Sequence, residues 1–202
     1  ATGDMEIDAA TRTQHLKLMA EQGRRMQNLV EDMLSLTRLE SIDYPVKPEK
    51  IDIGSMLEEI RRDGEALSGG RHQISLVVES GDIEGSGEEL HSAFSNLVSN
   101  AVRYTPEKGC IELIWRDSEI GPQFVVRDNG IGIQPEHIVR LTERFYRVDK
   151  GRSRATQGTG LGLAIVKHVL MRHGAALKIE SEPGKGSAFI AQFARTGPVL
   201  AS

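Results

Sequence analysis

Residues 9–41 limit the possible folds more strongly than any other stretch, because they predict one long amphipathic helix. Apolar residues recur there at intervals of three and four, charged residues fall between them, and no proline occurs before Pro45. The apolar stripe consists of Leu16, Met19, Gly23, Met26, Val30 and Met33, widened by Leu29, Leu36 and Leu39. One helix cannot bury such a stripe alone, so we expect a partner helix in this chain or in a second copy. An ordinary core helix of a globular domain is the alternative.

The pattern changes after Pro45 and Pro48, where we expect a short linker. Beyond it, β-rich segments alternate with helix-like segments. The expected elements are residues 51–67 (a strand, then a helix), 74–79 (strand), 87–104 (helix), 111–115 and 124–127 (strands), 161–173 (helix), and 177–180 with 188–193 (hairpin). This mixture predicts the α+β class, as a sandwich of one sheet covered by helices.

Composition excludes several classes of protein. A length of 202 residues predicts one or two domains, and a net charge of −4 argues against a dedicated nucleic-acid-binding protein. Cys110 is the only cysteine, which excludes an intrachain disulfide and a cysteine-based zinc site. Because no apolar run approaches the roughly 20 residues of a membrane span, and no signal peptide is evident, we expect a soluble, intracellular stretch of chain.

Two amides lie four residues apart in the helix predicted over residues 87–104. Asn96 and Asn100 therefore project from one helix face, which Arg103 and Tyr104 continue. An amide among apolar residues costs stability unless it has a partner, and its oxygen suits Mg²⁺. Arg103 would then reach a phosphate group. The alternative, that both amides only cap neighbouring loops, stays open.

Asp128 follows a predicted strand and precedes Gly130 and Gly132, which let the backbone turn tightly beside a bound molecule. A carboxylate in that place suits the exocyclic amine of adenine. Guanine has a carbonyl there, so Asp128 would select ATP over GTP. An ordinary Asx turn after a strand is the alternative.

Glycines also alternate with other residues from Gly158 to Gly162, directly before an apolar helix. Backbone N–H groups and the positive end of the helix dipole would face an anion there. The spacing matches neither a dinucleotide-binding fingerprint nor a Walker A loop. A flexible loop with a helix cap is the alternative.

A local excess of positive charge lies within the long connection from residue 129 to 160. Within residues 140–154 the basic residues are Arg140, Arg144, Arg147, Lys150, Arg152 and Arg154, against only Glu143 and Asp149. This reversal of charge fits a lid over a polyphosphate, with a solvated charged loop as the alternative. The order of all four features favours one ligand, since each suits a different part of it.

These segments together resemble the N, first glycine, F and second glycine boxes of sensor histidine kinases. The matching residues are Asn96 and Asn100, Asp128-Asn-Gly-Ile-Gly132, Glu143-Arg-Phe145-Tyr146-Arg147 and Gly158-Thr-Gly-Leu-Gly-Leu163. Residues 141–154 most resemble the phosphate-regulon branch. The resemblance implies an ATP-binding α/β sandwich of the gyrase, chaperone and histidine kinase superfamily over residues 46–202. Residues 1–45 would be a partial dimerisation and phosphotransfer domain, containing its second helix only.

The resemblance also implies a role for each matching residue. The implied metal ligands are Asn96 and Asn100, and the implied catalytic residues are Asn96, Arg103 and Arg147. The implied nucleotide-binding residues are Asn96, Asn100, Arg103, Tyr104, Asp128, Gly130, Gly132, Ile133, Phe145, Tyr146, Arg147, Gly158, Thr159, Gly160, Leu161, Gly162 and Leu163. Phe145 and Tyr146 would anchor the lid, and Arg147 would reach the γ-phosphate region. Arg103 stands where the family more usually has lysine, so a planar fork replaces a point charge.

The full protein, by this resemblance, uses ATP and Mg²⁺ to phosphorylate a histidine and then an aspartate of a response regulator receiver domain. The resemblance also implies a homodimer through residues 9–41 and the cytoplasmic portion of an inner-membrane-anchored sensor. The family's acceptor histidine lies in a Ser-His-Glu-Leu-Arg-Thr-Pro-like string, which this sequence lacks. We therefore expect a fragment that begins after the acceptor helix, binds ATP and does not phosphorylate itself.

Two other functions stay open on the sequence. One is another ATPase, or a serine-directed kinase, of the same superfamily, although its hydrolytic members use a glutamate where Asn96 stands. The other is a nucleotide-gated module that docks a partner through its helix without transferring phosphate.

Overall fold

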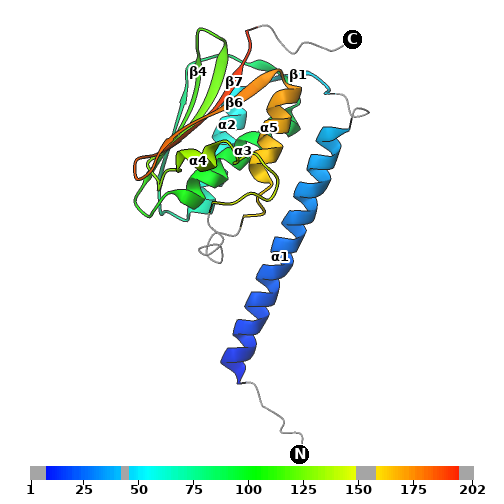
Figure 1. The fold of residues 1–202 in the computed structure, drawn as a ribbon, viewed down its shortest axis with the longest axis vertical. Coiled ribbons are helices and arrows are strands. Elements are labelled where there is room, and N and C mark those ends of the chain that lie inside the picture. The colour runs from blue at the N-terminus through cyan, green and yellow to red at the C-terminus, as the bar shows by residue number, and fades with distance from the viewer. Residues whose placement is uncertain (1–7, 42–45, 149–157, 196–202) are drawn as a thin grey trace, which may run out of the picture.

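The computed structural model describes residues 8–41, 46–148 and 158–195 (Figure 1). A long helix, α1, precedes a unit in which helices cover one face of a sheet, which confirms the predicted α+β class. Among these described residues, no helix combines the length and the apolar character needed to cross a lipid bilayer.

Helix α1 runs from Ala9 to Glu40, which confirms the helix predicted over residues 9–41. Its N-terminal end extends away from the rest of the molecule, and its C-terminal part packs on α5 (Figure 1). Leu36 and Leu39 are buried in that contact. The predicted stripe lies elsewhere on the helix, because Met19 and Met26 remain 70% and 68% exposed. Leu29, Leu36 and Leu39, which widen the predicted stripe, therefore pack against the rest of this chain, whereas Met19 and Met26 of the stripe itself do not.

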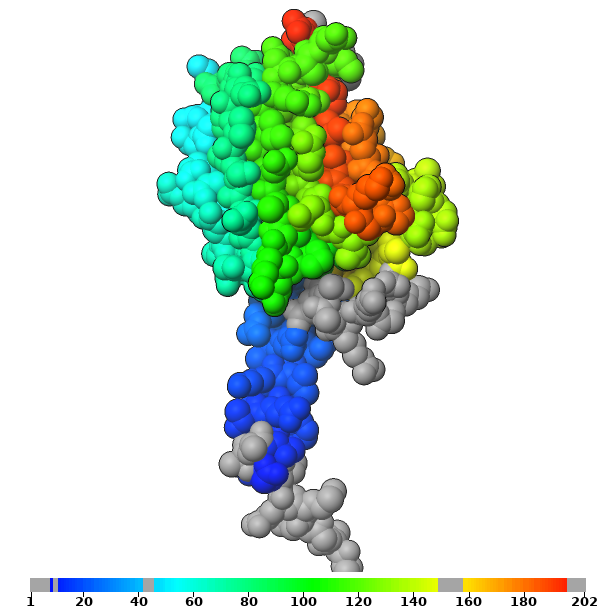
Figure 2. Space-filling view, turned by 90° about the vertical axis from the view of Figure 1, so that its left-hand side faces the viewer, coloured from blue at the N-terminus to red at the C-terminus, as the bar shows by residue number. Residues whose placement is uncertain are grey.

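The main sheet has the strand order β2-β4-β5-β7-β6, and Figure 2 shows its open face. Its strands are β2 (Gln73–Val78), β4 (Cys110–Asp117), β5 (Pro122–Asp128), β6 (Ala175–Glu182) and β7 (Gly186–Phe193). Strands β2 and β4 are parallel, and the other neighbours are antiparallel. These strands, including the C-terminal hairpin, confirm the predicted ones. A two-stranded sheet of β1 (Glu49–Ile51) and β3 (Ile83–Gly85) includes one strand, β3, that the sequence pattern does not predict.

Three helices cover the other face of the main sheet: α2 (Ile53–Ser68), α3 (Gly87–Tyr104) and α5 (Gly162–Arg172). Helix α3 begins where predicted because the Ser86 side chain accepts the Glu89 N–H. Helix α4 (Pro135–Ile138) is a single turn that the sequence pattern does not predict.

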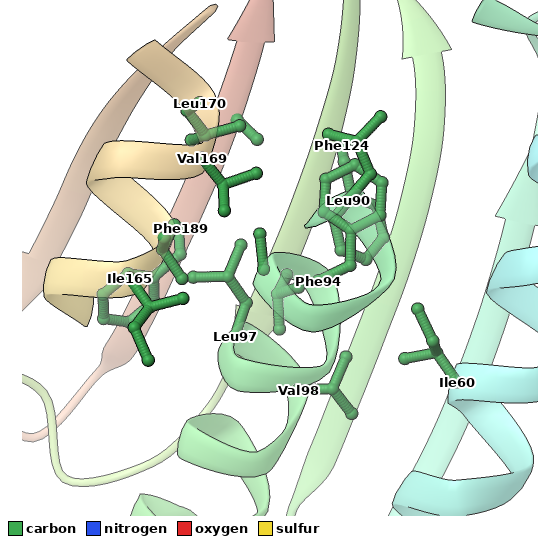
Figure 3. Close-up of a cluster of buried hydrophobic side chains, with 14 of the residues drawn as sticks. Ile60, Leu90, Phe94, Leu97, Val98, Phe124, Ile165, Val169, Leu170 and Phe189 are labelled. Carbon is green, nitrogen blue, oxygen red and sulfur yellow. The ribbon is translucent and has the colours of Figure 1, made fainter. Parts of the chain in front are cut away.

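Apolar packing fixes α3 between α5 and α2 (Figure 3). Phe94 and Leu97 of α3 are fully buried and belong to the same core cluster as Ile165 and Val169 of α5. The Phe94 ring also packs at a tilt against the Phe124 ring of β5, with ring centroids 4.5 Å apart. Because these contacts set the rotation of α3, they also determine where its polar face points.

Candidate functional site

A cavity of about 320 Å³ lies between α3, the start of α5, the segment after β5, residues 141–148 and α1. All but three of the predicted nucleotide-binding residues line it, and the exceptions are Gly130, Phe145 and Leu161. The fold therefore brings together residues that are far apart in the sequence.

The polar face of α3 forms one wall. The Asn96 Nδ2 atom donates to the Ser92 carbonyl at 3.0 Å, which turns the Asn96 Oδ1 atom away from the helix backbone. The Asn100 Oδ1 atom instead accepts from Arg103 Nη1 at 3.3 Å. Among the described residues, no donor is hydrogen-bonded to the Asn96 oxygen. This oxygen is therefore the more accessible ligand for a cation.

The glycine segment before α5 approaches this wall closely. A Cβ atom on Gly162 would lie 2.5 Å from Asn96 Oδ1, and one on Gly158 would lie 3.1 Å from Arg103 Nη1. A side chain at position 162 would therefore have to displace the Asn96 amide from its observed position. Leu161 does not line the cavity. Its side chain is buried in the hydrophobic core and so holds residues 158–162 against that core.

Asp128, at the end of β5, lies at another side of the cavity and is 7% exposed. The Gly130 N–H donates to its Oδ1 at 2.8 Å, and the Ser187 N–H also donates to its carboxylate. Burial raises the pKa of Asp128, and these two hydrogen bonds oppose part of the rise. Gly130 thus acts on the site through Asp128. The apolar side chains of Ile133 and Phe189 also line the cavity, so this part suits a flat ring with a polar edge.

Residues 141–148 close a further side. The Phe145 N–H donates to the Gly160 carbonyl at 2.9 Å, and Arg147 Nη1 donates to the Gly158 carbonyl at 2.5 Å. The Phe145 side chain is 55% exposed and lies outside the cavity, so its backbone makes the connection. These contacts join the predicted lid directly to the glycine segment.

Tyr146 makes two side-chain contacts that hold the same segment. Its hydroxyl lies 2.7 Å from His137 Nδ1, and the Arg140 guanidinium stacks over its ring at 4.3 Å from the centroid. Arg140 also pairs with Glu143, and Arg144 pairs with Glu40 of α1.

The predicted basic lid is only partly described by the structure. Arg140, Arg144 and Arg147 lie in described segments, and of these only Arg147 lines the cavity. The other predicted lid residues, Lys150, Arg152 and Arg154, lie outside the described residues.

One wall of the cavity was missed by the sequence analysis. Asn28, Glu31 and Asp32 of α1 line it, and Thr159 Oγ1 donates to Asp32 Oδ2 at 2.6 Å. Polar residues on a long helix give no signal of such a contact. Further lining residues that were not singled out are Ser99, Ile131, Leu141, Val148, Ser187 and Phe189. Ser99 was accessible to the same reasoning, because it lies three residues from Asn96 on the polar face of α3.

Comparisons with known proteins give the family and the fold of the chain. The sequence profile of the family described as histidine kinase-, DNA gyrase B-, and HSP90-like ATPase matches residues 85–197. The phosphate regulon sensor protein PhoR of Pseudomonas aeruginosa is 54% identical over 181 residues, which cover 89% of this chain and 41% of that protein. PhoR of Haemophilus influenzae is 39% identical over 190 residues, covering 92% and 44%. The chain thus spans about two fifths of the length of these relatives.

Solved structures show the same fold. Full-length ShkA in complex with AMPPNP superimposes with a TM-score of 0.78 at 26% identity, over 98% of this chain and 41% of that one. The Acinetobacter baumannii histidine kinase AdeS superimposes with a TM-score of 0.75 at 20% identity, over 96% of this chain and 88% of that one.

Proposed function

Because the chain belongs to the family of histidine kinase-, DNA gyrase B-, and HSP90-like ATPases, we propose that its cavity binds ATP with Mg²⁺ as the catalytic part of a sensor histidine kinase. In that role, the γ-phosphoryl group of ATP passes to a histidine and then to an aspartate of a response regulator receiver domain. One observation carries the proposal: a single cavity joins the amide face of α3, the buried Asp128 and the glycine segment before α5.

Asp128 recognises the adenine base in this proposal. Its carboxylate is buried, and two backbone N–H groups fix its position, so it presents a directed acceptor to an exocyclic amine. Guanine presents a carbonyl oxygen at the same place, which would leave two acceptors facing each other in a buried site. Ile133 and Phe189 supply apolar surface for the ring.

The donor set fits Mg²⁺, with Asn96 and Asn100 as its protein ligands. Mg²⁺ prefers oxygen ligands and usually keeps water and substrate phosphates in its shell, so one or two neutral amide oxygens suffice. The Asn96 amide is held by Ser92 with its oxygen turned outward, and Gly162 leaves space beside that oxygen. When bound, the cation neutralises charge on the phosphate chain.

The phosphate chain would lie along the start of α5. Thr159, Gly160 and Gly162 line the cavity at the positive end of that helix, where backbone N–H groups favour an anion. Arg103 of α3 and Arg147 of residues 141–148 both line the cavity, and both guanidinium groups lie close to Gly158. These residues position the phosphates and neutralise charge, which is most of what phosphoryl transfer requires of a protein.

Residues 1–45 would belong to the dimerisation and phosphotransfer domain, and residues 46–202 to the catalytic domain. The exposed apolar residues Leu16, Met19, Met26, Val30 and Met33 of α1 support a homodimer through this helix in the full-length protein. We assign the chain to the cytoplasmic portion of an inner-membrane-anchored sensor.

A nucleotide titration tests the binding part of the proposal. ATP and GTP are compared, with and without Mg²⁺, on the wild type, on Asp128→Asn and on Asp117→Asn, an exposed acid at the end of β4 that serves as the control. We expect metal-dependent preference for ATP in the wild type and in Asp117→Asn, and loss of that preference in Asp128→Asn. Equal affinity of the wild type for ATP and GTP would contradict the assignment of Asp128.

A second experiment tests phosphoryl transfer. The chain is incubated with labelled ATP and a separate polypeptide that carries an acceptor helix, and the label on its histidine is measured. We expect transfer to the acceptor and no stable label on this chain. Hydrolysis of ATP without transfer would indicate another ATPase of the superfamily, and binding without either reaction would indicate a nucleotide-gated module.

A further inference from the structure

The C-terminal end of α1 is held against the catalytic unit by several contacts. Leu36 and Leu39 are buried, and the Leu39 carbonyl accepts from Arg172 Nη1 at 3.5 Å. The Glu40 carboxylate pairs with Arg144 and lies 3.2 Å from His168 Nε2. Together these contacts fix which face of α1 turns towards the cavity.

Asp32 lies on that face, two turns before Glu40. It is half-buried, and its carboxylate accepts the Thr159 hydroxyl at 2.6 Å. Burial raises the pKa of Asp32; the Thr159 hydrogen bond lowers it, the nearby Glu31 raises it, and Arg103 lowers it. The net rise means that the surroundings of this carboxylate compensate its negative charge incompletely.

The bonded partner of Asp32 is part of the segment to which the phosphates are assigned above. Thr159 Oγ1 also accepts the Leu161 N–H at 3.2 Å, so Asp32 contacts the turn that begins α5. A terminal phosphate at this helix end would use the same hydroxyl and would place a second negative charge beside Asp32. Two like charges in a partly buried site repel each other far more strongly than in water.

We propose that Asp32 is a specificity-determining residue of the nucleotide site. While α1 is docked, its carboxylate competes with the terminal phosphate of a nucleoside triphosphate for Thr159, so the docked arrangement favours a nucleoside diphosphate. This inference rests on the proposed ATP-binding function. It follows that ATP binds at the expense of the contact between Asp32 and Thr159, whereas ADP leaves that contact in place.

Calorimetric titration with Mg-ATP and Mg-ADP tests the inference. Asp32→Asn keeps an oxygen that can accept the Thr159 hydroxyl but removes the charge. We expect its affinity for Mg-ATP to rise about tenfold and its affinity for Mg-ADP to change less than about twofold. The control is Glu21→Gln, which removes the same charge from the same helix outside the cavity and leaves both affinities unchanged.

The possible outcomes separate this inference from the proposed function. If the wild type binds neither nucleotide, both are overturned. If both nucleotides bind but the ratio of their affinities is the same in Asp32→Asn and the wild type, only the inference fails. A fall in Mg-ATP affinity in Asp32→Asn also overturns the inference, because it would mean that this carboxylate assists the metal ion.

A distance measurement gives an independent test. Cys110 is exposed at the start of β4 and Met26 is exposed on α1, so spin labels on Cys110 and on Met26→Cys report the position of α1 relative to the sheet. We expect Mg-ATP to lengthen or broaden the distance distribution and Mg-ADP to leave it unchanged. A distribution that is the same with ATP and without nucleotide overturns the inference.

Discussion

Gly162 lies so close to Asn96 that a Cβ atom on the glycine would be 2.5 Å from the Asn96 Oδ1 atom. Gly162→Ala must therefore displace the amide or shift the start of α5. We expect Mg²⁺-dependent ATP affinity to fall at least about tenfold, equivalent to about 1.4 kcal/mol. The free energy of unfolding should change by less, because alanine gains about 1 kcal/mol of helix propensity over glycine. Nucleotide titration and urea unfolding of the same variant measure the two effects.

Gly23→Ala is the matched control for that variant. Gly23 lies in the interior of α1, and no atom lies within 4 Å of where its Cβ would be. This substitution should stabilise the helix by up to about 1 kcal/mol and leave ATP affinity unchanged. If Gly162→Ala binds Mg-ATP as tightly as Gly23→Ala does, Asn96 is not a metal ligand.

Asp128 predicts a pH dependence of nucleotide binding. Burial raises its pKa above the ordinary value of 3.8, so it takes up a proton at a higher pH than a typical aspartate. In the proposed assignment, adenine requires the ionised Asp128 acceptor, and ATP affinity should therefore fall as the pH is lowered through this raised pKa. Titrations at pH 7.5 and at successively lower pH values, as far as the protein stays folded, should show this fall in the wild type and a smaller one in Asp128→Asn. An equal fall in both proteins would assign the titration to another group.

The same burial has an opposite consequence for stability. A raised pKa in the folded state means that ionised Asp128 opposes folding at neutral pH, and that this cost is relieved as the pH falls through the folded-state pKa. The free energy of unfolding of Asp128→Asn at pH 7 should therefore equal or exceed that of the wild type, even though we expect this variant to lose its preference for ATP. Urea unfolding at pH 7 measures this, and a large loss of stability would show that the two backbone hydrogen bonds require the carboxylate.

His173 should make the fold sensitive to mild acid. Its Nε2 accepts the Ser86 N–H at 3.0 Å and its Nδ1 lies 2.8 Å from the Val169 carbonyl, an arrangement that suits the neutral ring. Burial lowers the pKa of His173 below 6.5; the Val169 carbonyl and Glu89 raise it, and Arg172 lowers it. The unfolded chain then takes up a proton before the folded chain does. The contribution of His173 to the free energy of unfolding is thus fully present above about pH 6.5, and it declines as the pH falls from there towards the folded-state pKa of His173.

Urea unfolding at pH 7.5 and 5.5 checks this expectation. His173→Gln should lose about 1–3 kcal/mol at pH 7.5, because buried hydrogen bonds are broken, but it should lose less than the wild type between the two pH values. His15→Gln, on the exposed part of α1, is the control and should follow the wild type at both. If His173→Gln loses as much free energy of unfolding between pH 7.5 and 5.5 as the wild type does, other groups cause the acid sensitivity.

Strong periodicity explains what the sequence could predict of the fold. Helix α3 has its predicted bounds because an eight-residue buried face recurs at helical spacing and Ser86 caps it. Strand β3 has three residues and exists only through its pairing with β1, so no local pattern marks it. Helix α4 is similarly a single turn of four residues, too short for its own sequence to show a helical pattern.

The site was predictable where its chemistry is local. Asn96, Asp128 and Gly160 each stand in a short segment whose residue types suit one part of a nucleotide. The wall of the cavity that α1 forms was not predictable, because Asp32 and Thr159 are 127 residues apart and meet only when the whole helix packs on the catalytic unit. The apolar stripe also pointed to an interaction surface, but the surface used within this chain is the adjacent one, at Leu36 and Leu39.

That division of α1 into two faces can be tested by truncating one side chain on each. Leu36 is 4% exposed against the catalytic unit, whereas Met33, one turn earlier, is 49% exposed. Leu36→Ala should cost about 2–4 kcal/mol of docking free energy, because the lost apolar contact leaves a cavity, and it should speed amide hydrogen exchange in the C-terminal half of α1. Met33→Ala should leave that exchange unchanged in the monomer. The reverse pattern would mean that the stripe, and not the Leu36 face, holds α1 to the catalytic unit.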